Sequence, residues 1–142
     1  MKKIEIYTDG ACSGNPGVGG WGAVLIYNGN KKEIFGGEKY TTNNKMELTA
    51  VIKSLESLKE PCEIDLYTDS TYVKNGITEW IYSWKKNGWK NSKKEEVKNK
   101  DLWQTLDLLT RQHKINWFWV KGHANNEMNN RADELARMEV YK

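Results

Sequence analysis

The chain has few of the side chains that build disulfide frameworks and zinc sites. Among its 142 residues there are two cysteines, Cys12 and Cys62, and two histidines, His113 and His123, and none of them lie at metal-binding spacings. Zinc is therefore not expected, because a zinc site needs a cluster of cysteines or histidines. We interpret both cysteines as free thiols in a reducing cytosol and not as a disulfide.

Long apolar runs are also absent. No stretch of 18 apolar residues occurs, so no transmembrane helix and no membrane partner are expected. The start Met1-Lys2-Lys3 is basic, but the segment after it is too polar for a signal peptide. A chain of this length is most simply one domain, residues 1–142, with a core of ordinary size. We expect a cytoplasmic monomer.

The most informative pattern is a short phrase that occurs twice. Ile4-Glu5-Ile6-Tyr7-Thr8-Asp9 and Ile64-Asp65-Leu66-Tyr67-Thr68-Asp69 both alternate apolar and polar residues, as a strand does, and both end on aspartate. If the two strands are parallel neighbours, Asp9 and Asp69 lie together at the carboxyl end of one sheet, where open α/β folds place their sites. Adjacent carboxylates raise each other's pKa unless a cation intervenes. The phrase therefore predicts a divalent metal site.

Positive charge is concentrated in residues 85–100, which we call the basic segment. It contains seven lysines and two glutamates, a local net charge of +5, whereas the whole chain carries +3. The rest of the chain therefore carries −2. A basic segment in the same domain as an acidic site predicts an anionic polymer that is bound near a metal.

The remaining patterns predict an α/β fold. Strands are expected over 3–12, 21–27 and about 33–35, with a turn-rich loop over 13–19 and a hairpin turn at Asn28-Gly29. Helices are expected over about 44–58, 71–81, 101–109 and 129–140, with strands over 64–69 and 115–120 between them. Right-handed crossovers then give a mixed five-stranded sheet, an antiparallel meander plus parallel strands, with helices on both faces.

Two further acids are expected in the first turns of helices. Glu47 lies three residues after Asn44, so it either completes a capping box or belongs to a site. Asp133 either pairs with Arg137 at i+4 or belongs to a site. Taken alone, each acid is better explained as structural.

The motifs taken together favour a functional role. Tyr-Thr-Asp-Gly with Gly-Asn-Pro-Gly, Asn-Asn-Lys-Met-Glu-Leu, Tyr-Thr-Asp-Ser, Lys-Gly-His and Asn-Arg-Ala-Asp-Glu-Leu-Ala occur in that order. In these motifs the chain resembles a bacterial type 1 ribonuclease H over almost its whole length, which implies a ribonuclease H-like fold. The resemblance implies a metal-dependent endoribonuclease that cleaves the RNA strand of RNA–DNA hybrids and leaves 5′-phosphate and 3′-hydroxyl ends.

The resemblance assigns the catalytic roles residue by residue. Four carboxylates, Asp9, Glu47, Asp69 and Asp133, match the ligands of two divalent ions, and Mg²⁺, with Mn²⁺ as a substitute, suits such hard oxygen ligands. His123 matches a residue that moves protons or orients the attacking water and helps the product to leave. The near-neutral pKa of histidine suits that work.

The resemblance also assigns contacts with the hybrid. The matching positions are Cys12, Asn15, Thr42, Asn43, Asn44, Thr71 and Asn99. Thr42 and Asn99 match residues that grip a phosphate of the DNA strand. Thr42 and three asparagines, Asn15, Asn43 and Asn44, match positions that touch the minor groove and backbone, where a 2′-hydroxyl distinguishes RNA. Cys12 matches a position near the RNA strand, with a packing or backbone-contact role and not a nucleophilic one. Turns and helix caps would equally explain the asparagines. Tyr40 stands where some relatives have arginine, with Lys39 as a partial substitute, and Thr71 replaces a longer amide; both departures predict weaker contacts.

The tryptophans divide between core and substrate. Trp80 and Trp84, at i and i+4 beside lysines, are assigned with Lys85 and Lys86 to a groove for the DNA strand. Trp89 is expected to pack within the protrusion that the basic segment forms in this family, and Trp103, Trp117 and Trp119 are expected in the core.

Two alternatives stay open. One is a hybrid-binding module with a decayed site, against which the four acids argue. The other is a different nuclease of the same fold, such as a resolvase or transposase domain, which usually lacks the Lys-Gly-His loop and the basic segment.

Overall fold

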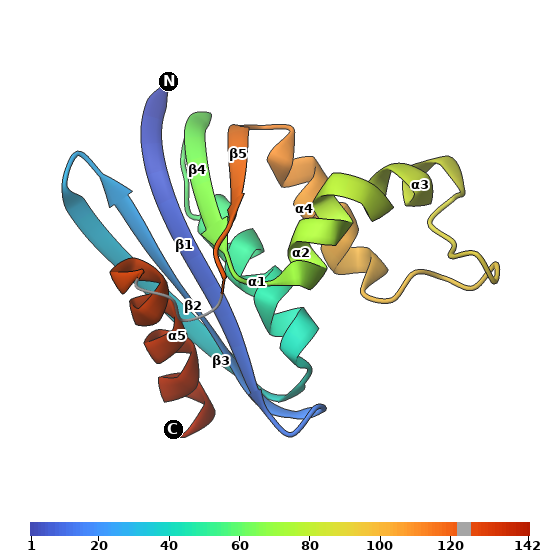
Figure 1. The fold of residues 1–142 in the computed structure, drawn as a ribbon, viewed down its shortest axis with the longest axis horizontal. Helices are drawn as coiled ribbons and strands as arrows, with labels where there is room; N and C mark the ends of the chain where they lie inside the picture. The colour runs from blue at the N-terminus through green and yellow to red at the C-terminus, as the bar shows by residue number, and fades with distance from the viewer. Residues whose placement is uncertain (122–125) are drawn as a thin grey trace.

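Five strands form one mixed sheet in the order β3-β2-β1-β4-β5 (Figure 1). The computed structural model describes residues 1–121 and 126–142. The strands are β1 (Lys2–Ser13), β2 (Gly17–Tyr27), β3 (Asn30–Thr41), β4 (Cys62–Thr68) and β5 (Lys114–Trp119). The helices are α1 (Asn43–Glu56), α2 (Thr71–Asn75), the π-helical turn η1 (Gly76–Trp80), α3 (Ile81–Lys86), α4 (Lys100–Thr110) and α5 (Glu127–Val140).

The strand directions confirm the predicted topology. β1 pairs antiparallel with β2, and β2 with β3, whereas β4 runs parallel to both β1 and β5. At the β2–β3 hairpin, Asn28 and Gly29 have φ values of 50° and 77°, the left-handed conformation that a two-residue hairpin turn requires. The meander is longer than predicted, because Gly17 and Gly19 belong to β2 and not to a loop; a β-bulge between them shifts the register against β3.

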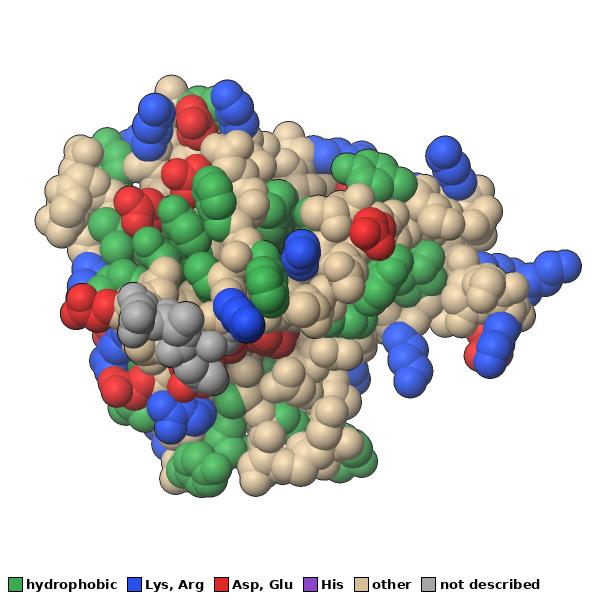
Figure 2. All heavy atoms as spheres, in the orientation of Figure 1, with side chains coloured by type: hydrophobic (Ala, Val, Ile, Leu, Met, Phe, Trp, Pro, Cys, Tyr) green, Lys and Arg blue, Asp and Glu red, His purple; other side chains and the backbone are tan. Residues whose placement is uncertain are grey.

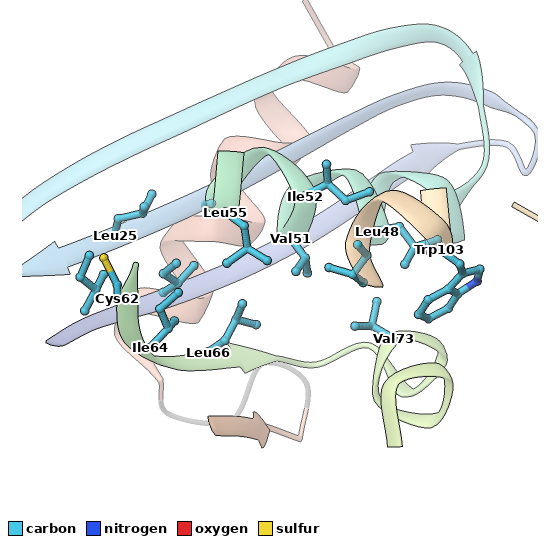
Figure 3. Close-up of a cluster of buried hydrophobic side chains, with 14 of the residues drawn as sticks. Leu25, Leu48, Val51, Ile52, Leu55, Cys62, Ile64, Leu66, Val73 and Trp103 are labelled. Carbon is cyan, nitrogen blue, oxygen red and sulfur yellow. The ribbon is translucent and has the colours of Figure 1, made fainter. Parts of the chain in front are cut away.

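Helices cover both faces of the sheet, and the alternation of each strand decides which side chains they meet. On the α1 face, Ile6 of β1 packs with Leu48 of α1 and Leu66 of β4 in the main core, part of which Figure 3 shows. On the other face, Tyr7 packs with Leu135 of α5. Burial of each large apolar side chain in these two clusters stabilises the fold by roughly 1.5–3 kcal/mol.

Residues 71–86 form one continuous helical stretch, because the junction residues Gly76 and Ile81 both have helical backbone angles. It is longer than predicted, and its last two residues begin the basic segment at one end of the molecule (Figure 1). Gly76 lies directly against the Trp103 ring, so a Cβ at this position would overlap the indole. This contact lets the stretch approach α4 closely.

Four local predictions need correction. Trp119 is 42% exposed and not part of the core, because it ends the edge strand β5. Thr42, not Asn44, caps α1: its backbone is extended and its hydroxyl accepts from the Lys45 N–H at 3.2 Å. Since α1 begins at Asn43 and α5 at Glu127, Glu47 and Asp133 lie in second turns and not in first turns.

Other predictions about single residues are confirmed. Both cysteines are free, Trp103 is fully buried, and Trp117 is half-buried against the main core.

None of the helices in the part of the chain that the structure describes has the length and apolar character needed to span a membrane.

Candidate metal centre and its surroundings

The two repeated phrases place their aspartates side by side. Residues 2–8 of β1 pair in parallel register with residues 62–68 of β4, so Thr8 is opposite Thr68. Asp9 and Asp69 each follow directly, where the pairing of the two strands ends: Asp69 lies just beyond β4, whereas β1 continues past Asp9 along β2 to Ser13. The adjacency predicted from sequence is therefore confirmed.

Glycines let two helices reach this edge of the sheet. A Cβ on Gly10, the residue after Asp9, would lie 2.5 Å from the backbone nitrogen of Glu47. Gly22, which pairs with Asp9 across β1 and β2, would place a Cβ 2.6 Å from the Cβ of Leu135 in α5. Without these glycines α1 and α5 could not pack so closely against the sheet on either side of Asp9.

Three carboxylates from three separate elements converge here. One carboxylate oxygen from each of Asp9, Glu47 and Asp69 lies within 4.8 Å of the other two. Asp133 of α5 lines the same pocket, whose volume is about 290 Å³, and also accepts from the Arg137 Nε at 2.8 Å. Asp133 thus lines the pocket and also pairs with Arg137 at i+4. The sequence left these two roles open as alternatives, and the structure contains both.

The carboxylates interact strongly with one another. Burial first, and then the charge of Asp69, raise the pKa of Asp9 to about 8, and Asp133 pushes it in the same direction. Burial, followed by Asp9 and Asp69, raises the pKa of Glu47 well above its ordinary value. In a site where a third acid raises the pKa of two buried acids, a bound cation would stabilise the ionised carboxylates.

The donor set fits a hard divalent cation. The described residues that line this pocket include acids, amides and hydroxyls but no lysine or arginine. Asp133 has Arg137 as a partner, whereas no ion pair involves Asp9, Glu47 or Asp69 among the described residues. Carboxylate oxygens are the ligands that Mg²⁺ and Mn²⁺ prefer. The arrangement suits such an ion better than it suits an internal ion pair.

Several residues assigned to the substrate surround the carboxylates. Asn43, Asn44 and Thr71 line the acidic pocket itself. Asn15 lies beside them and accepts from the Asn43 backbone N–H at 3.1 Å. Cys12 is partly exposed and donates its thiol to the carbonyls of Gly14 and Thr41, at 2.8 and 3.4 Å.

A second group of residues lies between the helical stretch 71–86 and α4. Asn99 adopts a left-handed conformation (φ 59°) just before α4, and its amide donates to the Tyr72 hydroxyl at 3.1 Å. The same hydroxyl accepts from the Trp103 indole N–H at 3.0 Å. Tyr72 also lines the acidic pocket, so it connects that pocket to Asn99.

The half-buried rings of Trp80 and Trp84 continue this group along the helix. Their centroids lie 5.9 Å apart, and Trp89 follows at 6.2 Å from Trp84. Both lysines that follow are exposed; Lys85 pairs with Asp107 at 2.8 Å, and Lys86 is in no ion pair among the described residues. His123 lies outside the described residues.

Sequence reasoning missed two residues at the site. Ser70 caps α2 by accepting from the Val73 N–H at 3.1 Å, and its position directly before a helix could have revealed it. Tyr72 was not singled out, because its two hydrogen-bond donors lie 27 and 31 residues away in the chain.

Comparisons with known proteins agree with this geometry. The RNase H family model matches residues 1–141. The chain is 63% identical over 144 residues to a ribonuclease HI of Brucella melitensis biotype 1, and 64% identical to a ribonuclease H of Brucella anthropi; each match covers the whole chain and 94% of the relative.

Solved structures give the same result. LC9-RNase H1, described as a type 1 RNase H with the type 2 active-site motif, superposes with a TM-score of 0.90 at 30% identity, covering 99% of this chain and 73% of that one. LC11-RNase H1 in complex with RNA/DNA hybrid superposes with a TM-score of 0.74 at 26% identity, covering 97% and 96%.

Proposed function

Because the chain belongs to the ribonuclease H family, we propose that it is a metal-dependent endoribonuclease that hydrolyses the RNA strand of RNA–DNA hybrids and leaves 5′-phosphate and 3′-hydroxyl ends. The observation that carries the proposal is the convergence of Asp9, Glu47 and Asp69 from three separate elements in a pocket lined by Asp133. The relative LC11-RNase H1, whose structure contains an RNA/DNA hybrid, supports the choice of substrate.

The four carboxylates would hold two Mg²⁺ or Mn²⁺ ions. When bound, such ions neutralise the charge of the scissile phosphate and lower the pKa of water. Asp9 is central, since Glu47, Asp69 and Asp133 all influence its pKa. Asp9 would therefore hold metal together with the other three carboxylates.

The rest of the pocket would orient the hybrid. Asn43, Asn44 and Thr71 offer amide and hydroxyl groups beside the acids, where they can bond to the 2′-hydroxyl groups that only the RNA strand carries. Asn15 and Cys12 lie at the edge of this surface.

The DNA strand would pass over the second group of residues. Thr42 and Asn99 would hold one phosphate, and Trp80 and Trp84 would form the adjoining groove, from which the lysines of the basic segment continue. Figure 2 shows blue side chains, the colour shared by lysine and arginine, at the end of the molecule where this segment projects, and the segment itself contains lysines and no arginine. Lysines there would bind phosphates without sequence preference.

His123 would act as an accessory base or water-orienting group. Its proposed role comes from its place in the Lys-Gly-His motif. General acid–base assistance contributes typically 10²–10⁴-fold, so turnover should slow but persist without it.

The test is incubation of the protein with labelled RNA–DNA hybrid, RNA duplex and DNA duplex, with and without Mg²⁺. Cleavage of the RNA strand of the hybrid alone, and only with metal, is expected. Asp69→Asn should abolish cleavage with the fold intact, whereas Asp65→Asn should not. Asp65 is a matched control, because it lies on β4, the strand that Asp69 directly follows, but accepts from Asn116 outside the acidic pocket. Binding of the hybrid without cleavage at any metal concentration would contradict the proposal.

A further inference from the structure

Outside the acidic pocket, Asp107 of α4 joins two cations in one junction. The Lys85 ammonium lies 2.8 Å from Asp107 Oδ1, and Arg111 Nη2 donates to Asp107 Oδ2 at 2.7 Å. The Asp107 side chain is only 12% exposed, so its charge needs these partners. Arg111 lies on the same helix as Asp107, and therefore only Lys85 ties a second element, α3, to α4.

Aromatic contacts flank this junction on the same two helices. Trp84, the residue before Lys85, packs against Trp103, one turn before Asp107, with ring centroids 5.4 Å apart. Trp84 also contacts Trp89 of the basic segment, at 6.2 Å. One ionic and one aromatic contact, at consecutive residues of α3, therefore hold the end of this helix against α4.

The basic segment depends on this attachment for its position. Residues 87–99 contain no helix or strand; one isolated bridge, Lys90 with Glu96, and a few backbone hydrogen bonds hold them together. Trp89 packs against the main core, and Val97 is buried in it. The orientation of the segment is thus set at the end of α3 and at these two apolar contacts, and Lys85 lies at the first of these attachments.

Lys85 also differs from its neighbours in having a partner. Among the described residues, the only lysines of the basic segment in ion pairs are Lys85 and, at a looser 3.8 Å from Glu96, Lys100. Lys86, at the next position of the same helix, is in none of these ion pairs, although both lysines are exposed. Adjacent lysines of the same segment therefore have different environments.

We infer that Lys85 and Asp107 are positioning residues for substrate binding: Lys85 does not contact a phosphate but fixes, through Asp107, the root of the basic segment and with it the DNA-strand groove. This inference rests on the proposed function. The sequence assigned Lys85 to direct contact with the DNA strand. The inference instead leaves that contact to the unpaired lysines of the segment.

The experiment compares Lys85→Met, Lys86→Met and the double variant Lys85→Met/Asp107→Leu. Hybrid binding is measured by fluorescence anisotropy in EDTA across a salt series, and kcat and KM are measured with Mg²⁺. Each phosphate contact contributes roughly 0.7–0.9 to the log–log salt slope. Lys86→Met should flatten the slope by about this amount, whereas Lys85→Met should leave it unchanged, raise KM about threefold or more, and change kcat less than twofold.

The double variant separates position from charge. The Asp107 side chain is only 12% exposed, so its loss of the Lys85 partner leaves a nearly buried charge that Leu does not carry. Lys85→Met/Asp107→Leu should therefore restore KM to within twofold of the wild type although the Lys85 charge is still missing. A flatter slope in Lys85→Met, or a KM that the double variant does not restore, would overturn the inference. If Lys85→Met does not fold, the slope of the double variant decides in the same way. Wild-type protein that neither binds nor cleaves the hybrid would instead refute the proposed function.

Discussion

Removal of one carboxylate from the acidic pocket should make the stability of the metal-free protein less sensitive to pH. Burial, and then Asp69, raise the pKa of Asp9 from 3.8 to about 8. Between these values the folded protein holds a proton that the unfolded chain has released. The contribution of this proton to the free energy of unfolding is fully present below the unfolded pKa. It is lost progressively as the pH rises from the unfolded pKa through the folded pKa. Burial raises the pKa of Glu47 as well, which acts in the same direction.

The size of the effect follows from one bound proton. A difference of one proton changes the free energy of unfolding by about 1.4 kcal/mol per pH unit, so the Asp9 contribution falls by roughly 3 kcal/mol between pH 5 and pH 7. For a domain of this length, roughly 3–4 °C of Tm per kcal/mol gives a decrease of about 10 °C. His113 acts in the opposite direction, because burial lowers its pKa, but it is present in every variant compared.

The assay is thermal melting by circular dichroism in EDTA, from pH 5 to pH 8. Wild-type Tm should fall with rising pH, Asp9→Asn should show a much shallower fall, and Asp65→Asn, on β4 outside the pocket, should follow the wild type. Saturating Mg²⁺ should remove most of the fall, since a bound cation replaces the proton. A Tm that is equally pH-dependent in Asp9→Asn and the wild type would refute the electrostatic account of this pocket.

Three further outcomes are expected. Gly22→Ala should destabilise the protein by about 1–3 kcal/mol in urea unfolding, because the new Cβ meets Leu135 and displaces α5; an unchanged midpoint would contradict this packing. His123→Ala should slow turnover by at most roughly 10²–10⁴-fold, and a loss as complete as that of Asp69→Asn would give the histidine a more central role. Among the described residues, four lysines of the basic segment that are in no ion pair can be neutralised together: Lys86, Lys90, Lys93 and Lys94. Their neutralisation should raise KM more than it lowers kcat and should flatten the salt dependence of hybrid binding. An unchanged salt slope together with an unchanged KM would exclude a groove for the DNA strand here.

Local patterns in the sequence predicted most of the fold. The alternation in the two repeated phrases predicted β1 and β4, and their final aspartates predicted where the site would form. Asn28-Gly29 predicted its hairpin, since the left-handed backbone of that turn depends only on the residues within it. Such features depend on neighbours in the chain, and they can therefore be recognised without knowledge of the tertiary structure.

The helix starts were less predictable from the sequence. Asn44 and Glu47 have the spacing of a capping box, yet Thr42 is the cap, because Thr42 is the residue that keeps an extended backbone as β3 passes into α1. Trp119 resembles a core residue by composition, but the end of an edge strand leaves it 42% exposed. Its indole N–H instead donates to the Asp69 carbonyl at 3.2 Å.

The sequence by itself predicted which acids belong to the site, because the order of the motifs carries the resemblance that assigns them. Only the tertiary structure decided how those acids behave and what the nearby charges do. The raised pKa of Asp9 depends on burial and on Asp69, sixty positions away, and on the close approach of α1 that Gly10 permits. Lys85 and Lys86 are the same residue type at adjacent positions, and only the packing of α3 against α4 gives one of them a carboxylate partner. A side chain's type is local, but its electrostatic environment is made by elements that are distant in the chain.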